Sequence, residues 1–291
     1  MAEKTFIEKM QKIDRRIIFL LIALAVIIPM MLNLVFVVRP SPIVESIFEK
    51  IESMPSGSKV LLSFDYGPST VPENQPMADC LTRHLMIKGH KIYIMALWPT
   101  GDPQAKVTID SVILKEFPTA RYGTDYIQLG FKAGNQGLIN AIFTDLKGMY
   151  TTDVNGTDIN QFPMMKDVNK LPDFDLILAV CSGKPGIMEW IQFAADRGNI
   201  PFAAGVTAVE APQDYPYYPA QLLGLMGGLQ GAAELEAAVV RAYPQYKDTG
   251  LTAVKLMGPQ TVAHLVIIFF VVVGNVAFFV QRRRDKLARM R

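Results

Sequence analysis

Two short segments of the sequence carry residue types that could do chemistry. Asp65 follows an apolar run, where α/β hydrolases and phosphotransferases often keep a carboxylate and where helix caps and loop anchors are as common. Cys181 is a candidate nucleophile. Ser182-Gly183-Lys184 precedes a predicted helix and could hold an anion on backbone N–H groups, although an ordinary tight turn between a strand and a helix gives the same pattern.

The motifs predict no cofactor and no metal. Ser182-Gly183-Lys184 lacks the spacing of a Walker loop, and no Gly-x-Gly-x-x-Gly motif follows the first predicted strand. The two cysteines and three histidines show no zinc-ligand spacing. Cys80 and Cys181 are expected to be buried free thiols, with a disulfide between them as the alternative in an oxidising compartment.

Cys181 also lacks an expected general base. His84 and His90 fall on or just after a helix that covers a face of the predicted sheet, whereas Cys181 follows a strand. A Cys-His pair needs the two side chains within hydrogen-bond reach of each other. We therefore assign no catalytic residue and favour a protein that is not an enzyme. A hydrolase that uses Asp65 or Cys181 is kept as an alternative.

The elements that position these residues alternate between strand and helix from Ile43 to Tyr246. Short apolar runs bounded by turn residues predict buried strands at 59–64, 91–97, 126–129, 175–180 and 201–206. Capped or amphipathic segments predict helices at 43–54, 76–89, 104–116, 135–147, 186–197 and 219–242, and the stretch 150–172 is predicted to leave the sheet. This alternation is typical of an α/β fold with a doubly wound, mostly parallel sheet of about five strands, Rossmann-like or flavodoxin-like.

The carboxyl ends of parallel strands form the edge where open α/β sheets bind ligands. Four segments of this chain reach that edge, and they supply the candidate residues for a small solute or anion. These residues are Asp65, Ser69, Thr70, Trp98, Thr100, Ser182, Gly183, Lys184 and Thr207.

The last predicted helix of the domain contains four closely spaced glycines. On a helix, Gly224, Gly227, Gly228 and Gly231 would form one flat face. Each glycine costs about 1 kcal/mol relative to alanine in a helix, so close packing must offset the cost. We expect this face to pack inside the domain, with a contact between copies of the chain as the alternative.

Two long apolar runs flank the domain. Residues 17–38 and 261–280 contain no Asp, Glu, Lys or Arg, and at about 1.5 Å per residue each spans about 30 Å, the thickness of a bilayer's hydrocarbon core. The first run is too long for a signal peptide and ends in a poor cleavage site, so we interpret it as a signal anchor. The predicted organisation is a cytoplasmic segment 1–16, a transmembrane helix 17–38, an extracytoplasmic α/β domain 39–260, a transmembrane helix 261–280 and a basic cytoplasmic tail 281–291.

The basic residues at both ends of the chain predict the orientation. They lie outside the two apolar runs, at Lys4, Lys9, Lys12, Arg15, Arg16, Arg282, Arg283, Arg284, Lys286, Arg289 and Arg291. Lys and Arg collect on the cytoplasmic side of membrane proteins. We therefore expect a two-pass protein of the cell (inner) membrane with both termini in the cytoplasm and the domain in the periplasm or outside the cell.

Three polar side chains inside the apolar runs are expensive in lipid and are therefore informative. Asn33 and His264 are predicted near the outer edge of the bilayer, where they could hydrogen-bond if the helices pair. Asn275 is predicted near the inner edge without a counterpart on the first run. Its side chain either reaches the membrane–water interface or hydrogen-bonds to its own backbone, or it contacts a helix of another subunit.

The composition excludes one class of partner and favours another. The net charge of +2 and the absence of a basic stripe interleaved with aromatic residues argue against nucleic acid. The expected partners are the lipid bilayer and other membrane subunits or further copies of this chain. The sequence therefore predicts a non-catalytic, doubly anchored subunit of a membrane complex whose outer domain mediates protein assembly. A tethered receptor for a small solute or anion is the second hypothesis, and the hydrolase is the third.

Overall fold

The computed structural model describes residues 14–289, and the chain divides into two units. The α/β unit comprises Val38–Val254, and the second unit comprises the two ends of the chain, Met1–Val37 and Lys255–Arg291. The α/β unit is built on a six-stranded sheet in which all neighbouring strands are parallel. Its strands are β1 (Lys59–Asp65), β2 (Lys91–Ala96), β3 (Tyr126–Phe131), β4 (Leu176–Cys181), β5 (Phe202–Val206) and β6 (Gly224–Gly227).

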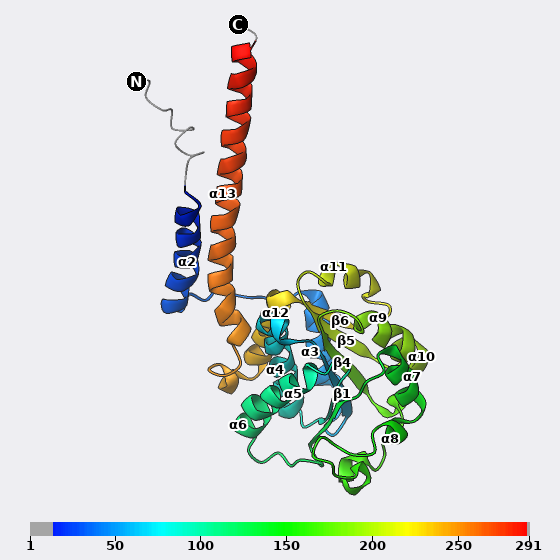
Figure 1. Cartoon of the computed structure of the whole chain (residues 1–291). Helices are drawn as coiled ribbons and strands as arrows, with labels where there is room; N and C mark the ends of the chain where they lie inside the picture. Colours follow the sequence, from blue (N-terminus) through cyan, green and yellow to red (C-terminus); the bar gives the residue numbers. More distant parts are fainter. Residues whose placement is uncertain (1–13, 290–291) are drawn as a thin grey trace. The chain divides into compact units, whose positions relative to one another are not determined.

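The strand order β3-β2-β1-β4-β5-β6 is the order of a doubly wound Rossmann fold. Figure 1 labels the strands β1, β4, β5 and β6. The prediction of an α/β fold with a parallel sheet is confirmed, with six strands in place of about five. The order reverses between β1 and β4, which places the switch point of the fold beside Asp65 and Cys181, paired in register at the ends of these two strands. β1 and β4 are buried almost throughout, as expected for strands covered on both faces.

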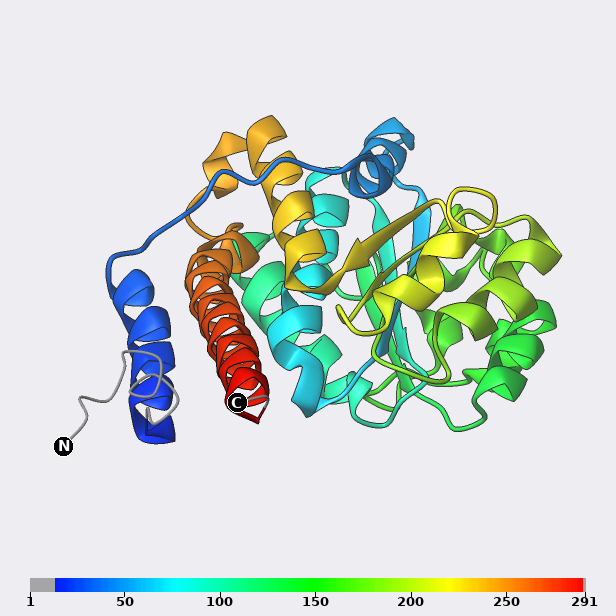
Figure 2. The same ribbon diagram turned by 90° about the horizontal axis from the view of Figure 1, so that it is seen from above.

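Helices cover both faces of the sheet (Figure 2). One face carries α3 (Pro42–Ser53), α4 (Val71–Ile87) and α12 (Gly228–Ala242), which pack on one another. α5 (Gly101–Thr108) continues through a π-helical turn into α6 (Leu114–Glu116) and packs against α4. The remaining helices are α7 (Gln136–Thr144), α8 (Leu146–Met149), α9 (Ile187–Trp190), α10 (Asp196–Gly198) and α11 (Ala211–Asp214), with a π-helical turn at Ile191–Ala195 between α9 and α10.

The predicted helix at 219–242 was wrong in its first part, because residues Gly224–Gly227 form the edge strand β6. The flat helical face of four glycines therefore does not exist. Gly224 lies in β6, where a Cβ atom would meet Ile47 of α3 at 2.5 Å, so its lack of a side chain lets α3 approach the strand. Gly227 ends β6 beside Tyr215, Gly228 begins α12 with a positive φ of 59°, and Gly231 lies against Met226.

The segment after α8 covers the opposite edge of the sheet. The backbone N–H of Val154 donates to the carbonyl of Gln128 in β3 at 3.2 Å. Ile159, Met165 and Leu171, from the same segment, are buried in the hydrophobic core. The excursion thus protects the edge strand β3 and extends the core.

Gly101 at the start of α5 is the position where the fold tolerates a side chain least. A Cβ atom there would lie 1.7 Å from the carbonyl oxygen of Phe64 in β1, so an added methyl group must push α5 away from the sheet. We expect Gly101→Ala to lower the free energy of unfolding by about 2–3 kcal/mol. Gly137→Ala is the matched control, since nothing lies within 4 Å of its added Cβ in α7. This control should be neutral or stabilising by up to about 1 kcal/mol, measured by urea denaturation of the full chain in detergent.

In the second unit, α2 (Arg15–Met31) is shorter than the predicted helix 17–38. The helix ends because Asn33 adopts the left-handed conformation with φ of 48°. The N–H of Asn33 then donates to the carbonyl of Met30, and the N–H of Leu34 donates to that of Pro29. This pattern is a Schellman motif, in which asparagine replaces the usual glycine.

α13 (Thr252–Arg289) is a continuous helix that contains the second apolar run. Within the described residues, it is the one helix whose length and composition suffice to cross a membrane, over Thr252–Arg283, and its most apolar 18-residue window has a mean hydropathy of 2.5. Only 11% of its most apolar window is buried within the structure. The helix begins in the α/β unit and continues, past Val254, in the second unit.

Candidate functional site

Asp65 lies at the carboxyl end of β1, at the switch point of the sheet, and is completely buried. One carboxylate oxygen accepts hydrogen bonds from the Ser63 hydroxyl at 2.8 Å and the Leu97 N–H at 2.7 Å. The other accepts from the Trp190 indole N–H at 2.9 Å and, at 3.9 Å, from the Cys181 thiol. All four donors belong to the protein, so this carboxylate joins the elements around β1, β2 and β4.

Burial raises the pKa of Asp65 to about 6, against the opposing effect of the hydrogen bonds from Trp190, Leu97, Ser63 and Cys181. A carboxylate that is sealed from solvent and already accepts four hydrogen bonds has no free lone pair for a substrate. The geometry therefore gives Asp65 the role of an anchor.

Three of the four predicted segments meet near this anchor. The Trp98 indole N–H donates to the carbonyl of Pro185 at 3.1 Å, and the Trp98 ring is 3.2 Å from where a Cβ of Gly183 would lie. The loops after β2 and β4 are therefore in contact. Thr100 donates from its hydroxyl to the carbonyl of Tyr66 in the loop after β1. Ser69, Thr100 and Lys184 are exposed, and Thr70, Ser182 and Thr207 are partly buried.

Cys181 is held in an environment that opposes the formation of a thiolate. Burial raises the pKa of its thiol well above the ordinary range, and the nearby carboxylates of Asp65, Glu210, Asp214 and Glu189 raise it further. Reactive cysteines need the opposite surroundings, with positive charge and partial exposure. Cys80 is likewise buried, and both cysteines are free thiols.

The histidines of the domain lie away from the carboxyl edge. The His84 Nε2 is 2.8 Å from the Glu52 carboxylate, and its ring stacks on Phe48, so it joins α4 to α3. The His90 Nε2 is 3.0 Å from the carbonyl of Ile51. Neither side chain can serve Cys181 as a base. In the part of the chain that the structure describes, no three His, Cys, Asp or Glu side chains are arranged to hold a metal ion.

A cluster of three carboxylates that the sequence did not reveal lies around the carboxyl end of β4. Glu189 comes from α9, Glu210 from the loop after β5, and Asp214 from α11. Burial raises the pKa of Glu210 to about 7 and that of Asp214 to about 6, and in each case neighbouring carboxylates add to the rise. The sequence signal was slight: two acidic residues four positions apart in the segment after the last predicted strand, with no spacing that links them to Glu189.

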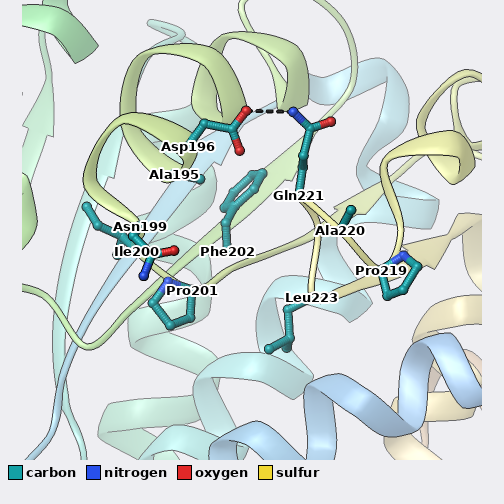
Figure 3. Close-up of a pocket in the computed structure, with 10 residues that line it drawn as sticks. All are labelled: Ala195, Asp196, Asn199, Ile200, Pro201, Phe202, Pro219, Ala220, Gln221 and Leu223. Atoms are coloured by element: carbon teal, nitrogen blue, oxygen red, sulfur yellow. Dashed lines mark hydrogen bonds between the residues drawn. The ribbon is translucent and has the colours of Figure 1, made fainter.

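Two grooves of similar size lie at opposite edges of the sheet. One, of about 470 Å³, lies at the carboxyl ends of β2 and β3, and Asp102, Lys132 and the buried Tyr150 are among its lining residues. The other, of about 400 Å³, lies at the amino ends of β5 and β6 (Figure 3). Two of its polar groups, Asp196 and Gln221, are hydrogen-bonded to each other at 2.6 Å. The first groove contains the buried Tyr150 hydroxyl, for which the described residues provide no hydrogen-bond partner, and it is therefore the better place for a small ligand.

Together, the fold and the carboxyl edge define a Rossmann-like α/β unit joined to an apolar helix that is long enough to cross a membrane. Comparisons with protein-family models, with curated proteins and with solved structures found no match for this chain.

Proposed function

We propose that this protein is a non-catalytic subunit of a membrane protein complex, anchored in the bilayer at both ends, whose α/β domain mediates protein–protein assembly. The observation that carries the proposal is the apolar surface of α13. Large side chains along this helix are more than half exposed, among them Leu265, Phe269 and Phe279, each at 61%. A surface of this length and composition requires lipid or partner helices to cover it.

Polar residues on this apolar helix support partner helices in addition to lipid. His264 and Asn275 are both exposed on α13, and nothing lies within 4 Å of where a Cβ of Gly274 would be. A polar side chain on a lipid-facing helix gains from a hydrogen bond to another helix, and a glycine beside it permits close approach. We assign His264 and Asn275 to contacts with a partner.

The N-terminal anchor is α2 with the apolar residues that follow it. Its helix of 17 residues is about 25 Å long, slightly short of the hydrocarbon core. The chain after it lies against α13, because a Cβ on Gly258 would be 1.9 Å from the carbonyl oxygen of Leu34. Asn33 caps the C-terminal end of α2 at this point. We therefore propose that it contacts a partner at the edge of the membrane. The basic flanks support cytoplasmic termini and a periplasmic domain.

Helix α12 fastens both chain segments that lead from the α/β domain to the two ends. Glu234 accepts a hydrogen bond from the N–H of Ser41, which caps α3. Glu236 accepts from the N–H groups of Ala253 and Val254 in the first turn of α13, at 3.0 Å each. Both carboxylates are largely buried, so each junction is a fixed part of the domain. This arrangement favours a domain whose connections to its two anchors are both held in place by hydrogen bonds.

The proposal is tested by purifying the full chain natively in a mild detergent and identifying the chains that co-purify. We expect defined partner chains, and we expect Asn275→Leu to reduce their recovery about three- to thirtyfold, the range that an interhelical hydrogen bond supplies. Val276→Leu is the matched control, since it changes the neighbouring exposed position without removing a polar group. A chain that elutes as a partner-free monomer would refute the proposal. A reporter at Arg291 that responds outside the cytoplasm would refute the orientation.

The groove at the carboxyl ends of β2 and β3 favours a second candidate function, a tethered receptor for a small solute. Tyr150 lines this groove, is 2% exposed, and has a buried hydroxyl without a hydrogen-bond partner. A buried polar group of this kind is where a ligand gains specificity. A melting temperature of the protein that responds to no member of a broad metabolite panel would count against this candidate.

A further inference from the structure

The acidic cluster at the end of β4 contains carboxylate oxygens to which no residue in the described part of the chain donates a hydrogen bond. Asp214 is 4% exposed, and its Oδ2 atom is buried with no hydrogen-bond partner. The Oε2 atom of Glu210 is also buried and unpartnered. Glu189 differs, since its carboxylate accepts the N–H of Gly186 at 2.8 Å. Buried polar atoms are nearly always satisfied, so these two oxygens are places where a donor from outside the described residues would gain a hydrogen bond.

The positive charge nearest to the cluster does not fill this role. Lys184 is close enough to lower the pKa of Glu210, but it is exposed, and none of the ion pairs within the described residues includes it. The three carboxylates thus interact electrostatically with a deficit of positive charge. Because like charges at close range oppose ionisation, a cation placed among them would bind with a gain in electrostatic energy.

Exposed apolar side chains directly adjoin each of the three carboxylates in the chain. Met188 precedes Glu189 and is 46% exposed, Val209 precedes Glu210 and is 85% exposed, and Tyr215 follows Asp214 and is 47% exposed. Such side chains are costly in water and are typical of protein interfaces. Energetic hot spots in interfaces combine a buried charged or aromatic anchor with surrounding contacts that exclude water.

We propose that Glu210 and Asp214 receive an arginine or lysine side chain of a partner protein, and that Met188, Val209 and Tyr215 close over it. This inference rests on the proposed assembly function and identifies the docking surface. A guanidinium group presents several N–H donors in one plane and can serve two carboxylates at once. A metal ion fits less well, because one of the three carboxylates is engaged by Gly186 and the described residues provide no ligand set.

The direct test uses N-acetyl-arginine methylamide as the probe on the full chain in detergent. At a concentration tenfold above its Kd, the probe should raise the melting temperature by about 2–4 °C, whereas the uncharged citrulline analogue should not. Glu210→Gln/Asp214→Asn should abolish this shift while leaving the protein at least as stable as the wild type. Glu49→Gln/Asp167→Asn, which neutralises two exposed carboxylates elsewhere, should retain the shift.

The second test measures recovery of the identified partner from native purification. Glu210→Gln/Asp214→Asn should lower recovery at least tenfold. Val209→Lys should do the same, because it places a positive charge at an exposed position, where it repels the positively charged side chain of the partner. Unchanged recovery with both variants overturns the docking surface and leaves the assembly function standing. If the wild type recovers no partner but its melting temperature still rises with the arginine probe, the assembly function is refuted instead. Stabilisation by Mg²⁺ or Ca²⁺ alone, without a response to the arginine probe, also overturns the inference.

Discussion

Replacing Asp65 with alanine will lower the free energy of unfolding by about 4–6 kcal/mol, because four buried donors lose their acceptor and a cavity remains. The donors come from β1, the end of β2, β4 and the helix after β4, so the loss affects the centre of the sheet. Urea denaturation of the full chain in detergent, followed by tryptophan fluorescence, measures the change. Trp190 is itself one of the donors and reports on the site directly.

Asp65→Asn removes the negative charge of the side chain but keeps its shape. The amide keeps one acceptor oxygen but turns an NH₂ group toward two of the donors, so we expect a loss of about 2–3 kcal/mol. Asp167→Asn is the control, since Asp167 is exposed. A loss below about 1 kcal/mol for Asp65→Ala would show that the network contributes little and would reopen a catalytic role for this carboxylate.

The pH dependence of the same pair of proteins gives an independent check. The folded-state pKa of Asp65 is about 6, above its ordinary value of 3.8, so between these values the folded chain binds more protons at this site than the unfolded chain. The site therefore gains stability as the pH falls from about 7 to about 4. Asp65→Asn lacks this titration, so the difference in stability between wild type and variant should widen as the pH falls.

The strands that the sequence predicted share one property, a continuous apolar run that a sheet covered on both faces requires. β6 has no such run: Gly224-Leu225-Met226-Gly227 reads equally well as helix, and its conformation is set by pairing with β5 and by the approach of α3 to Gly224. The early end of α2 likewise depends on the left-handed conformation of Asn33, which an apolar period does not encode. Tertiary contacts and single backbone angles decided these two cases.

The carboxyl edge of the sheet could be predicted as a location, because parallel βα units bring all strand ends together. Its chemistry could not. Asp65 has the sequence context of a catalytic carboxylate, yet its role depends on Trp190, 125 positions later in the chain. The pairing of Glu210 and Asp214 with Glu189 depends on β4 and β5 being neighbours in the sheet. Residues that come together from separate segments of the chain have no characteristic spacing in the sequence.

A second buried ionic group stabilises helices α4 and α12, and α12 holds the two segments that lead to the chain ends. Arg83 on α4 donates from Nε and Nη2 to the two oxygens of Glu116, at 2.7 and 2.8 Å, and the side chains are 5% and 8% exposed. Its charge also lowers the pKa values of Asp79 and Glu236, both of which burial raises. Arg83 is therefore the cation that three buried carboxylates share, and one of them, Glu236, holds the first turn of α13.

Arg83→Met should consequently destabilise the protein by about 3–5 kcal/mol, since it leaves Glu116 buried without a counterion. Arg83→Met/Glu116→Met removes both members of the pair and should recover most of this loss, to within about 1–2 kcal/mol of the wild type. Urea denaturation of the full chain measures both values, and the double-mutant cycle with Glu116→Met gives the coupling energy. A double variant no more stable than Arg83→Met would mean that Asp79 and Glu236, rather than Glu116, carry the dependence on Arg83. In that case the loss should appear first as faster hydrogen exchange in the first turn of α13, where Glu236 accepts its hydrogen bonds.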